Sequence, residues 1–356
     1  MISKEKLCAL LEYGIYAPSA DNLQPWQFKI GEALVDIYID TRYTANFCDE
    51  GLWIPYLSVG AVIENIRIAA LKFGCKFSAS IFPDSKNPLW AVRLRFQETQ
   101  AEESKYFPVI KKRLTNRKFY QTGKELPDSA YDALHQSIRH NHGYRLLMFK
   151  KNSAEYQKLT RIIGDSDQLR FETKRLHEEL IRVLRFPSKS AMSANDGLPV
   201  SALEAGPGSQ YMFKLMSSWQ RMSALNRLGM SKLFNLYARL QMNSSQAAGV
   251  IVSTQANPVT YLKGGVAMQK LWLEATLQGL ALQPMEALPI FVLNLQLNKT
   301  QDFTENQVKK LKTLKEEFYS LFGLGADHAV IFMFRIGYGT TASARTTRRS
   351  LESFLI

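Results

Sequence analysis

The chain has 356 residues, 46% hydrophobic and 22% charged, the composition of a globular protein with one large or two ordinary domains rather than a disordered or fibrous chain. Lys and Arg number 45 against 32 Asp and Glu, so the net charge is +13, a surplus that could serve nucleic acid, a membrane surface or a phosphate-bearing ligand. No block of like charges occurs, which favours a solvated basic surface for most of these residues.

The start of the chain and its few metal-ligand side chains indicate a cytoplasmic protein without a metal site. Lys4, Glu5 and Lys6 stand where a signal peptide would need apolar residues, and no run approaches the 18 consecutive apolar residues of a membrane span. The three cysteines lack CxxC spacing and are odd in number, which argues against a disulfide framework. His140 and His142 have no partner at ligand spacing, so we interpret them as part of a solvated turn.

The first predicted element is an amphipathic helix within residues 3–18, with Ser3 as its N-cap. The helical pattern is broken within residues 17–28, APSADNLQPWQF. Two prolines and several amides there lead into a strand at residues 26–30. A plain connector could be shorter and simpler, so this stretch is a candidate site, although its amides could equally hold a buried loop together. Trp26 is expected in the core, at the start of the strand.

Extended segments alternate with helical ones through the rest of the chain. One of the helices, at residues 127–143 with Asp128 as its N-cap, matches the first helix in length and also leads into a strand. The alternation predicts an α+β fold with mixed sheets flanked by helices. The predicted strands after the first lie at residues 34–40, 75–82, 91–96, 144–150, 247–254, 280–285 and 329–336.

Two long helical segments are similar to each other. Residues 56–74 and 261–279 align without a gap, and Tyr, Leu, Gly, Ala and the final Gly coincide. Together with the matching pairs of helix and strand, this similarity predicts two tandem halves. We expect the first half at residues 1–100 and the second at residues 101–356, joined through the polar sequence QETQAEES.

The second half carries a long extra segment, from about residue 165 to 246, that the first half lacks. Segments of this kind are commonly functional, often as lids, although a helix at a membrane surface has a similar composition. Seven apolar residues recur there at roughly helical spacing and predict one apolar face over the site. These residues are Met212, Met216, Trp219, Met222, Leu225, Leu228 and Met230.

Two short motifs resemble those of a known family. The pattern A-P-S-x-x-N-x-Q-P-W occurs at residues 17–26, and an Arg-rich pattern, RLTNRKF, occurs at residues 113–119. With the repeated helices and the C-terminal RRSLESFL, these motifs resemble the FMN-dependent nitroreductase family, in which two interlocked chains hold FMN between them. Each half carries only one of the two motifs, so the resemblance implies a fused double similar to the Acg-type branch, which mimics the family dimer and holds one FMN.

The resemblance also implies which residues bind FMN. Arg side chains and short hydroxyl donors suit its phosphate, and Arg117 resembles the family's cation beside the flavin ring. The sequence LQPMEALP resembles the family's Pro-x-Glu-Gly segment near flavin N5, with Ala287 in place of Gly. The candidate cofactor-binding residues are Pro18, Ser19, Ala20, Asn22, Gln24, Arg113, Thr115, Arg117, Pro284, Met285, Glu286, Arg345 and Arg348. No covalent catalytic residue is expected, because the cofactor carries the hydride chemistry.

Two functions follow from the resemblance. The first is an oxidoreductase that takes hydride from NAD(P)H and reduces nitro- or quinone-type acceptors. The second is an FMN-sequestering protein whose lid keeps NAD(P)H out. A nucleic-acid binder is a weaker third possibility, because no RNP, helix-turn-helix or zinc signature supports it, and P-loop, GxGxxG and GxSxG motifs are also absent from the sequence. As a pseudo-dimer within one chain, the protein could be a monomer.

Overall fold

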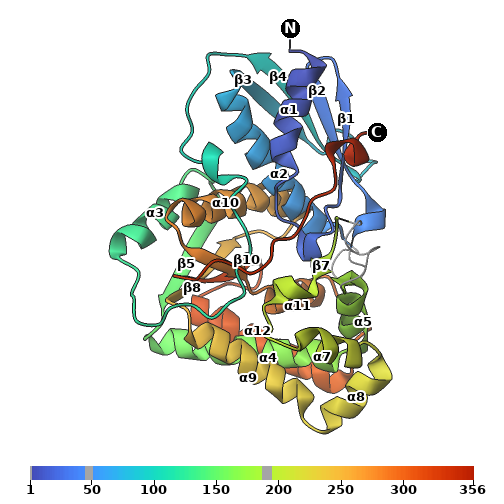
Figure 1. Ribbon diagram of the computed structural model, residues 1–356, viewed down its shortest axis with the longest axis vertical. Helices are drawn as coiled ribbons and strands as arrows, with labels where there is room; N and C mark the ends of the chain where they lie inside the picture. Colours follow the sequence, from blue (N-terminus) through green and yellow to red (C-terminus); the bar gives the residue numbers. More distant parts are fainter. Residues whose placement is uncertain (1, 45–50, 187–194) are drawn as a thin grey trace.

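Two four-stranded sheets form the frame of the protein, whose computed structural model describes residues 2–44, 51–186 and 195–356 (Figure 1). The first sheet contains β1 (Trp26–Gly31), β2 (Leu34–Ile39), β3 (Cys75–Ile81) and β4 (Trp90–Glu98). The second contains β5 (Tyr144–Lys150), β8 (Ala247–Ser253), β9 (Ala281–Pro284) and β10 (Ala329–Gly337). Their strand orders are β1-β2-β4-β3 and β5-β8-β10-β9, so strands in corresponding chain positions occupy corresponding places in the two sheets.

The strands within each of these sheets are antiparallel. Every pairing in both four-stranded sheets runs in this sense, which confirms an α+β fold but corrects the expectation of mixed sheets. The reason is visible between β1 and β2, where the turn is too short to hold the crossover that parallel neighbours require. A separate two-stranded pair, β6 (Leu184–Arg185) with β7 (Leu198–Pro199), is parallel.

The helices that accompany the two sheets also occur in corresponding positions. In the first half, α1 (Lys4–Gly14) precedes β1 and α2 (Trp53–Lys72) precedes β3. In the second, α3 (Asp128–Ile138) precedes β5 and α10 (Pro258–Leu277) precedes β9. Ser3 caps α1 as predicted, because its hydroxyl accepts from the Lys6 N–H at 3.2 Å. Asp128 does not cap α3, which corrects that expectation: Pro127 is the N-cap, and Asp128 instead forms an ion pair with Lys150 at 2.8 Å.

The two similar helices, α2 and α10, cross in the core at a pair of glycines. A Cβ at Gly60 would lie 1.9 Å from the Leu262 carbonyl oxygen, and one at Gly265 would lie 1.9 Å from the Leu57 carbonyl oxygen. The contact is therefore reciprocal, as in a two-fold interface between identical subunits. Among the described helices, only α2 is long and apolar enough to cross a membrane, yet 83% of its most apolar window is buried inside the protein.

The C-terminal arm returns from the second sheet to the first. Residues 338–350 run along the molecule without regular structure, and the chain ends beside β1 (Figure 1). The Phe354 ring packs against Trp26 and Phe28, with ring centroids 6.0 and 6.2 Å apart, and Leu355 forms a parallel bridge with Phe28. Trp26 is fully buried, as predicted. The arm therefore ties the two halves together.

The inserted segment is larger than expected and is built from several short helices. It begins directly after β5 and extends to β8, whereas its predicted start was about residue 165. Its helices are α4 (Ala154–Glu172), α5 (Lys174–Val183), α7 (Ser209–Leu215), α8 (Trp219–Arg227) and α9 (Met230–Asn243). We call residues 209–243, which contain α7 to α9, the lid. A second insertion, α11 (Ala287–Gln296) and α12 (Glu305–Phe322), lies between β9 and β10 and was not predicted.

Candidate functional site

A cavity of about 590 Å³ is lined by both halves and by the inserted segment, a volume suited to a cofactor-sized ligand. Its wall includes residues of α2, α10, α4, α5, α11, the lid and the C-terminal arm. Eleven of the thirteen candidate residues line it: Pro18, Ser19, Ala20, Asn22, Arg113, Thr115, Arg117, Pro284, Glu286, Arg345 and Arg348. Gln24 and Met285 do not. The folded chain therefore brings residues more than 300 positions apart to one site.

Arg113 is a buried cation in the cavity wall. Its side chain is only 4% exposed, its Nη2 donates to the Tyr16 carbonyl at 3.2 Å, and its guanidinium lies 4.5 Å from the centre of the Trp272 ring. Its Nε is buried without a hydrogen-bond partner. Burial, and then the charges of Arg348 and Arg345, lower the pKa of Arg113 well below its ordinary value. A charge in this position is costly unless an anion accompanies it.

Arg345 and Arg348 bring two further positive charges to the same part of the wall. The Arg348 guanidinium donates to the Ile15 and Ala17 carbonyls at 3.0 and 3.1 Å, and Arg345 donates to the Arg113 carbonyl at 3.1 Å. Burial and the charge of Arg345 lower the pKa of Arg348 to about 10. Within the described ranges, none of these three arginines forms an ion pair with a carboxylate. A doubly charged phosphate would supply the missing negative charge.

Gln24 holds the 17–28 loop in place. Its N–H donates to the Ser19 hydroxyl at 2.9 Å, its side-chain oxygen accepts from the Arg349 N–H at 3.0 Å, and its Nε2 donates to the Asn195 carbonyl at 2.9 Å. It has a φ of +57° and is fully buried, a conformation that persists only when the surroundings enforce it. Its predicted contact with the cofactor is therefore corrected to a structural role, because its amide serves the protein.

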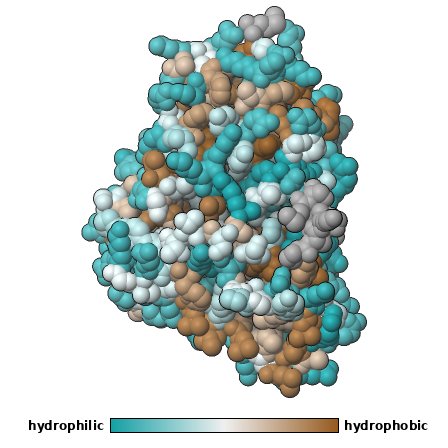
Figure 2. All heavy atoms as spheres, viewed as in Figure 1, coloured by the Kyte–Doolittle hydropathy of each residue, from teal (hydrophilic) through white to brown (hydrophobic). Residues whose placement is uncertain are grey.

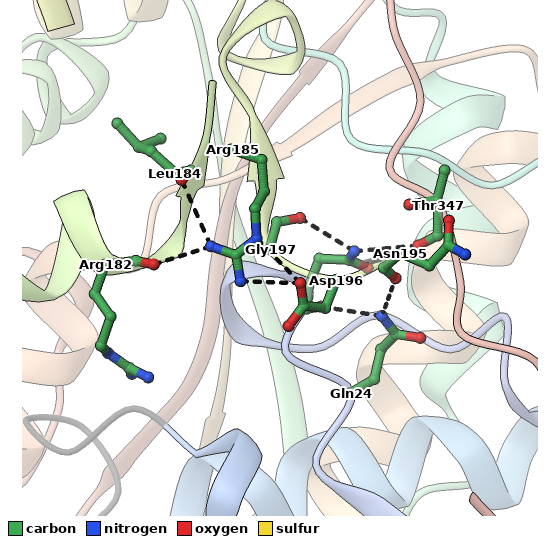
Figure 3. Close-up of polar contacts among 9 residues, drawn as sticks. Gln24, Arg182, Leu184, Arg185, Asn195, Asp196, Gly197 and Thr347 are labelled. Atoms are coloured by element: carbon green, nitrogen blue, oxygen red, sulfur yellow. Dashed lines mark hydrogen bonds and ion pairs between the residues drawn. The ribbon is translucent and has the colours of Figure 1, made fainter. Parts of the chain in front are cut away.

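Asn22 connects the same loop to the inserted segment and to the C-terminal arm. Its Nδ2 donates to the Gly197 and Thr347 carbonyls, both at 3.1 Å, and its Oδ1 accepts from Arg348. Figure 3 shows the neighbouring contact, in which the Arg185 guanidinium donates to Asp196 at 3.0 and 2.9 Å and so joins the strands β6 and β7. Although Asn22 lines the cavity, its amide is used within the protein.

Arg117 lies in a second group of charges on the cavity wall. Its Nη1 donates to the Ala202 carbonyl at 3.1 Å. Burial lowers the pKa of Arg117, and the nearby Asp21 opposes this shift. Thr115 lies between Arg113 and Arg117 and also faces the cavity. The Arg-rich motif thus supplies Arg113 to the first group of charges and Arg117 to the second.

Hydrogen bonds to backbone carbonyls fix the segment that follows Arg117. Gln241 of α9 donates to the Arg117 carbonyl at 2.8 Å, and the fully buried Arg335 of β10 donates to the Lys118 carbonyl at 2.7 Å. Asn116 holds the other side, because its N–H donates to the Leu282 carbonyl at 3.0 Å. The lid and the second sheet therefore both position Arg117.

The segment from Pro284 to Ala287 forms another part of the wall. Pro284, Glu286 and Ala287 line the cavity, but Met285 points into the core, and its N–H donates to the Met333 carbonyl at 2.8 Å. The expectation that the Met285 N–H reaches the cofactor is thus wrong, because β10 takes that hydrogen bond. Helix α11 begins at Ala287, so the first N–H groups of this helix have no partner within it.

Glu286 is a carboxyl group in the cavity wall that we expect to be protonated at neutral pH. Burial raises the pKa of Glu286 from 4.5 to about 8, although the Met333 N–H, which donates to Oε1 at 2.9 Å, opposes the shift. Between these two values the unfolded chain loses the proton and the folded chain keeps it, so this group makes stability fall as pH rises.

Glu286→Gln is therefore expected to be more stable relative to the parent at pH 9 than at pH 5. The gap should widen by as much as about 1.4 kcal/mol per pH unit across the interval between the two pKa values, because Gln cannot ionise. Urea unfolding of both proteins at the two pH values measures it. Equal differences at pH 5 and pH 9 would show that Glu286 ionises in the folded protein as it does in water.

The lid covers the cavity, but with different residues from those predicted. Met212 and Phe213 of α7 and Met230, Phe234 and Tyr237 of α9 line the cavity. Of the seven predicted residues only Met212 and Met230 do so. Met216 and Met222 are buried in the core of the inserted segment, and Leu228 is 86% exposed. The prediction of a single apolar face was wrong, because turns at residues 216–218 and 228–229 divide the lid into three separate helices.

The sequence did not indicate that several other residues would line the cavity. Trp272 and Met268 lie on α10, and Asp167 and Arg170 lie on α4. The repeat indicated that α10 matches α2, which also lines the cavity, but not that either helix would face a ligand. Burial raises the pKa of Asp167, and the charge of Arg170 opposes the shift.

The histidines and cysteines form no second site in the part of the chain that the structure describes. No group of three His, Cys, Asp or Glu side chains there has the arrangement of a metal site. Cys8 and Cys75 are free thiols, and Cys48 lies outside the described residues.

Comparison with known proteins finds distant similarity. No family model matches the chain. Over 340 residues the chain is 25% identical to an uncharacterized protein of Mycobacterium tuberculosis, MT1398, with the match covering 94% of this chain and 46% of that protein. The chain thus spans about half the length of the curated relative it matches.

Solved structures similar to this chain include nitroreductases. The FMN-dependent nitroreductase NfnB of Mycobacterium smegmatis, solved in complex with NADPH, is 15% identical, with 70% of this chain and 96% of that chain covered and a TM-score of 0.39. A putative nitroreductase from Desulfovibrio desulfuricans in complex with FMN is 12% identical, with 72% and 97% covered and a TM-score of 0.37. A nitroreductase with bound FMN from Desulfitobacterium hafniense is 13% identical, with 70% and 97% covered and a TM-score of 0.37.

Proposed function

We propose that the protein is an FMN-dependent oxidoreductase that binds one FMN per chain and reduces nitro- or quinone-type acceptors with NAD(P)H. The observation that carries the proposal is the group formed by Arg113, Arg345 and Arg348 in the wall of a largely apolar cavity, without a carboxylate partner among the described residues. The charges of Arg348 and Arg345 add to burial in lowering the pKa of Arg113, and the charge of Arg345 adds to burial in lowering that of Arg348, so the group needs an anion. The phosphate of FMN is such an anion, and the cavity has room for the rest of the cofactor.

The residues of the wall suit the parts of FMN. Arg113, Arg345 and Arg348, with the hydroxyls of Ser19 and Thr115, would hold the phosphate through charge-assisted hydrogen bonds. The aromatic and aliphatic side chains of the lid and of α10 would enclose the flavin ring. When bound, FMN supplies the centre that accepts hydride and passes electrons on.

The chain itself supplies position and electrostatics. Arg117 is a partly exposed cation in the cavity wall that would stabilise negative charge on the ligand group beside it. The N-terminus of α11 presents backbone N–H groups next to the cavity, and its positive end favours negative charge there. Phe213 and Phe234 exclude water from the lid side. The proposal includes a cytoplasmic location, where NAD(P)H is available.

We further propose that the two halves, residues 1–100 and 101–356, share this one site as the subunits of a dimer would. The first half contributes the 17–28 loop and α2, and the second contributes the Arg-rich segment, α10 and the C-terminal arm. The reciprocal contact of Gly60 and Gly265 supports a duplicated origin. A dimer of the family would have two equivalent FMN sites. Since each half of this chain has only one of the two motifs, the residues for a second FMN site are missing.

The direct test is anaerobic reduction of the FMN-loaded protein by NADPH and by NADH. The reaction is monitored through the loss of flavin absorbance near 450 nm, a general property of flavins. We expect rapid bleaching by at least one nucleotide, and reoxidation on adding a quinone or nitroaromatic compound. Dithionite provides the control for a reducible flavin. Bleaching by dithionite but by neither nucleotide would contradict the oxidoreductase and support the second function.

That second function, sequestration of FMN under a closed lid, is favoured by one observation. The lid is anchored firmly: a Cβ at Gly164 of α4 would lie 2.7 Å from the Asn235 side chain and 2.8 Å from that of Arg239, so α9 packs closely on α4. A lid held in this way limits access to the cavity, because a second ligand can enter only in the fraction of molecules that are open.

The variant Met212→Ala/Phe213→Ala is expected to speed flavin reduction by NADPH several-fold, because it removes two cavity-facing side chains of α7. Stopped-flow absorbance measures the rate. Leu215→Ala is the matched control, since Leu215 belongs to the same helix, is 53% exposed and does not line the cavity. An unchanged rate in the double variant would show that α7 does not limit access.

A further inference from the structure

The outer surface of the lid exposes an unusual amount of apolar side chain. Among the described residues, eleven large hydrophobic side chains are exposed, and seven of them lie within residues 209–243. Besides Met212, these are Tyr211, Leu215, Leu228, Leu233, Leu236 and Leu240. Figure 2 shows hydrophobic surface gathered at the lower end of the molecule, where Figure 1 places α8 and α9. Concentrated exposure of this kind marks an interaction surface.

The same 35 residues carry only positive charge. They contain five basic side chains, Lys214, Arg221, Arg227, Lys232 and Arg239, and no Asp or Glu. Four of the five are exposed, with Arg239 partly buried. In the described chain none of them forms an ion pair, whereas the basic residues of α4 and α5 commonly do. The lid is therefore unlike the adjoining helices, in which opposite charges alternate.

On α9 the apolar and basic residues are arranged in adjacent stripes. Leu233, Leu236 and Leu240 are spaced at three and four residues, so they lie on one face of the helix. Lys232 and Arg239 directly precede Leu233 and Leu240 and flank that face. Long basic side chains beside an apolar stripe are typical of helices that lie in a membrane interface.

Contacts other than these exposed leucines hold the lid in place. The lid has its own core, in which Met216 and Met222 are buried. It is also tied to the helices beneath it, because Asn226 donates to the Phe171 carbonyl and Ser231 donates to Glu172, both at 2.8 Å. Leu233, Leu236 and Leu240 are 58%, 53% and 47% exposed, so about half of their surface remains available to a partner.

We propose that the outer surface of the lid docks on an anionic lipid bilayer. The leucines would enter the apolar side of the interface while the basic residues contact acidic headgroups, and the two contributions together give stable peripheral binding. Charge complementarity selects this occupant, since a surface with five bases and no acid suits anionic lipid and repels a second copy of itself.

The docking surface includes the rim of the cavity. Met212 and Leu233 both line the cavity and are exposed, by 36% and 58%. A docked lid would therefore open the cavity toward the bilayer. Resting on the proposed oxidoreductase function, this geometry points to a membrane-dissolved quinone as the acceptor class.

Co-sedimentation with vesicles tests the docking itself and needs no activity. The full chain, with and without FMN, is mixed with vesicles of phosphatidylcholine alone or with 30% phosphatidylglycerol. We expect binding to the anionic vesicles that falls about fivefold for each basic side chain removed in Lys214→Gln/Lys232→Gln. Leu236→Ser/Leu240→Ser should weaken binding at least about tenfold. The controls are Lys4→Gln/Lys76→Gln and Leu277→Ser, which are exposed positions outside the lid.

Three outcomes would overturn the proposal. They are no binding to anionic vesicles, binding that the lid variants and the controls weaken equally, and a dimeric parent chain that Leu236→Ser/Leu240→Ser converts to a monomer. The last result would assign the surface to a second copy, and sedimentation velocity detects it. Because vesicle binding is measured apart from FMN binding and reduction, failure of docking leaves the proposed function standing, and the reverse also holds.

Discussion

Arg113→Met is expected to weaken FMN binding and, at the same time, to make the cofactor-free protein more stable. Loss of a charge-assisted contact with the phosphate should cost roughly 1.5–3 kcal/mol, or about 10- to 150-fold in affinity. In the cofactor-free protein the variant loses one hydrogen bond to Tyr16, worth about 1 kcal/mol, and the contact with Trp272. It also removes a buried charge whose cost, without an anion, is several kcal/mol. The second effect is larger, so stability should rise.

The opposite signs make this variant informative. Fluorescence titration with FMN measures the affinity, and urea unfolding of the cofactor-free protein measures the stability. Arg139→Met is the matched control, because it removes the same charge from an exposed position, and it should change neither quantity appreciably. If Arg113→Met lowers the stability of the cofactor-free protein and leaves FMN affinity unchanged, Arg113 has a structural role and the phosphate site is elsewhere.

Gly265→Ala is expected to destabilise the protein severely, by more than about 3 kcal/mol. The new methyl group would lie 1.9 Å from the Leu57 carbonyl oxygen, a backbone atom that cannot move without separating α2 from α10. Alanine gains about 1 kcal/mol over glycine in helix propensity, which is too small to offset this clash. Since both helices also line the cavity, FMN binding should be lost with the packing.

The matching change Gly60→Ala should have a similar effect, because its methyl group would meet the Leu262 carbonyl oxygen at the same 1.9 Å distance. Gly123→Ala is the control, since nothing lies within 4 Å of a Cβ at that position. Thermal unfolding compares the three variants. A melting temperature for Gly265→Ala within the range of Gly123→Ala would mean that the two helices do not cross as closely as the structure has them.

The periodicity of the sequence was sufficient to locate the main elements. All eight strands of the two large sheets lie where alternating or continuous apolar residues indicated, and α1 has its predicted cap at Ser3. These features depend on neighbours in the chain, which a sequence pattern records directly. The pairing of the strands was missed, because periodicity shows which side chains are buried but not which strand lies alongside.

The candidate site was predicted only in part, because it too depends on contacts between residues far apart in the chain. The residues of the two motifs converge on one cavity, but the chemistry of Arg113 depends on Arg345 and Arg348, more than 230 positions away, and on the absence of a described carboxylate near them. Gln24 shows the converse: its amide looked like a ligand contact, yet two distant backbone groups, the Asn195 carbonyl and the Arg349 N–H, bind it. Contacts of this kind, between residues far apart in the chain, cannot be predicted from a local sequence pattern.

The most direct test of the account is the number of FMN molecules bound per chain. The cavity combines parts of both halves, so the purified chain should bind FMN by isothermal titration calorimetry with a stoichiometry of one, and bound flavin released by heat should equal the protein in molar amount. A stoichiometry of two would contradict the shared site, because each half would then hold a cofactor by itself. No binding at all would contradict the assignment of the cavity to FMN.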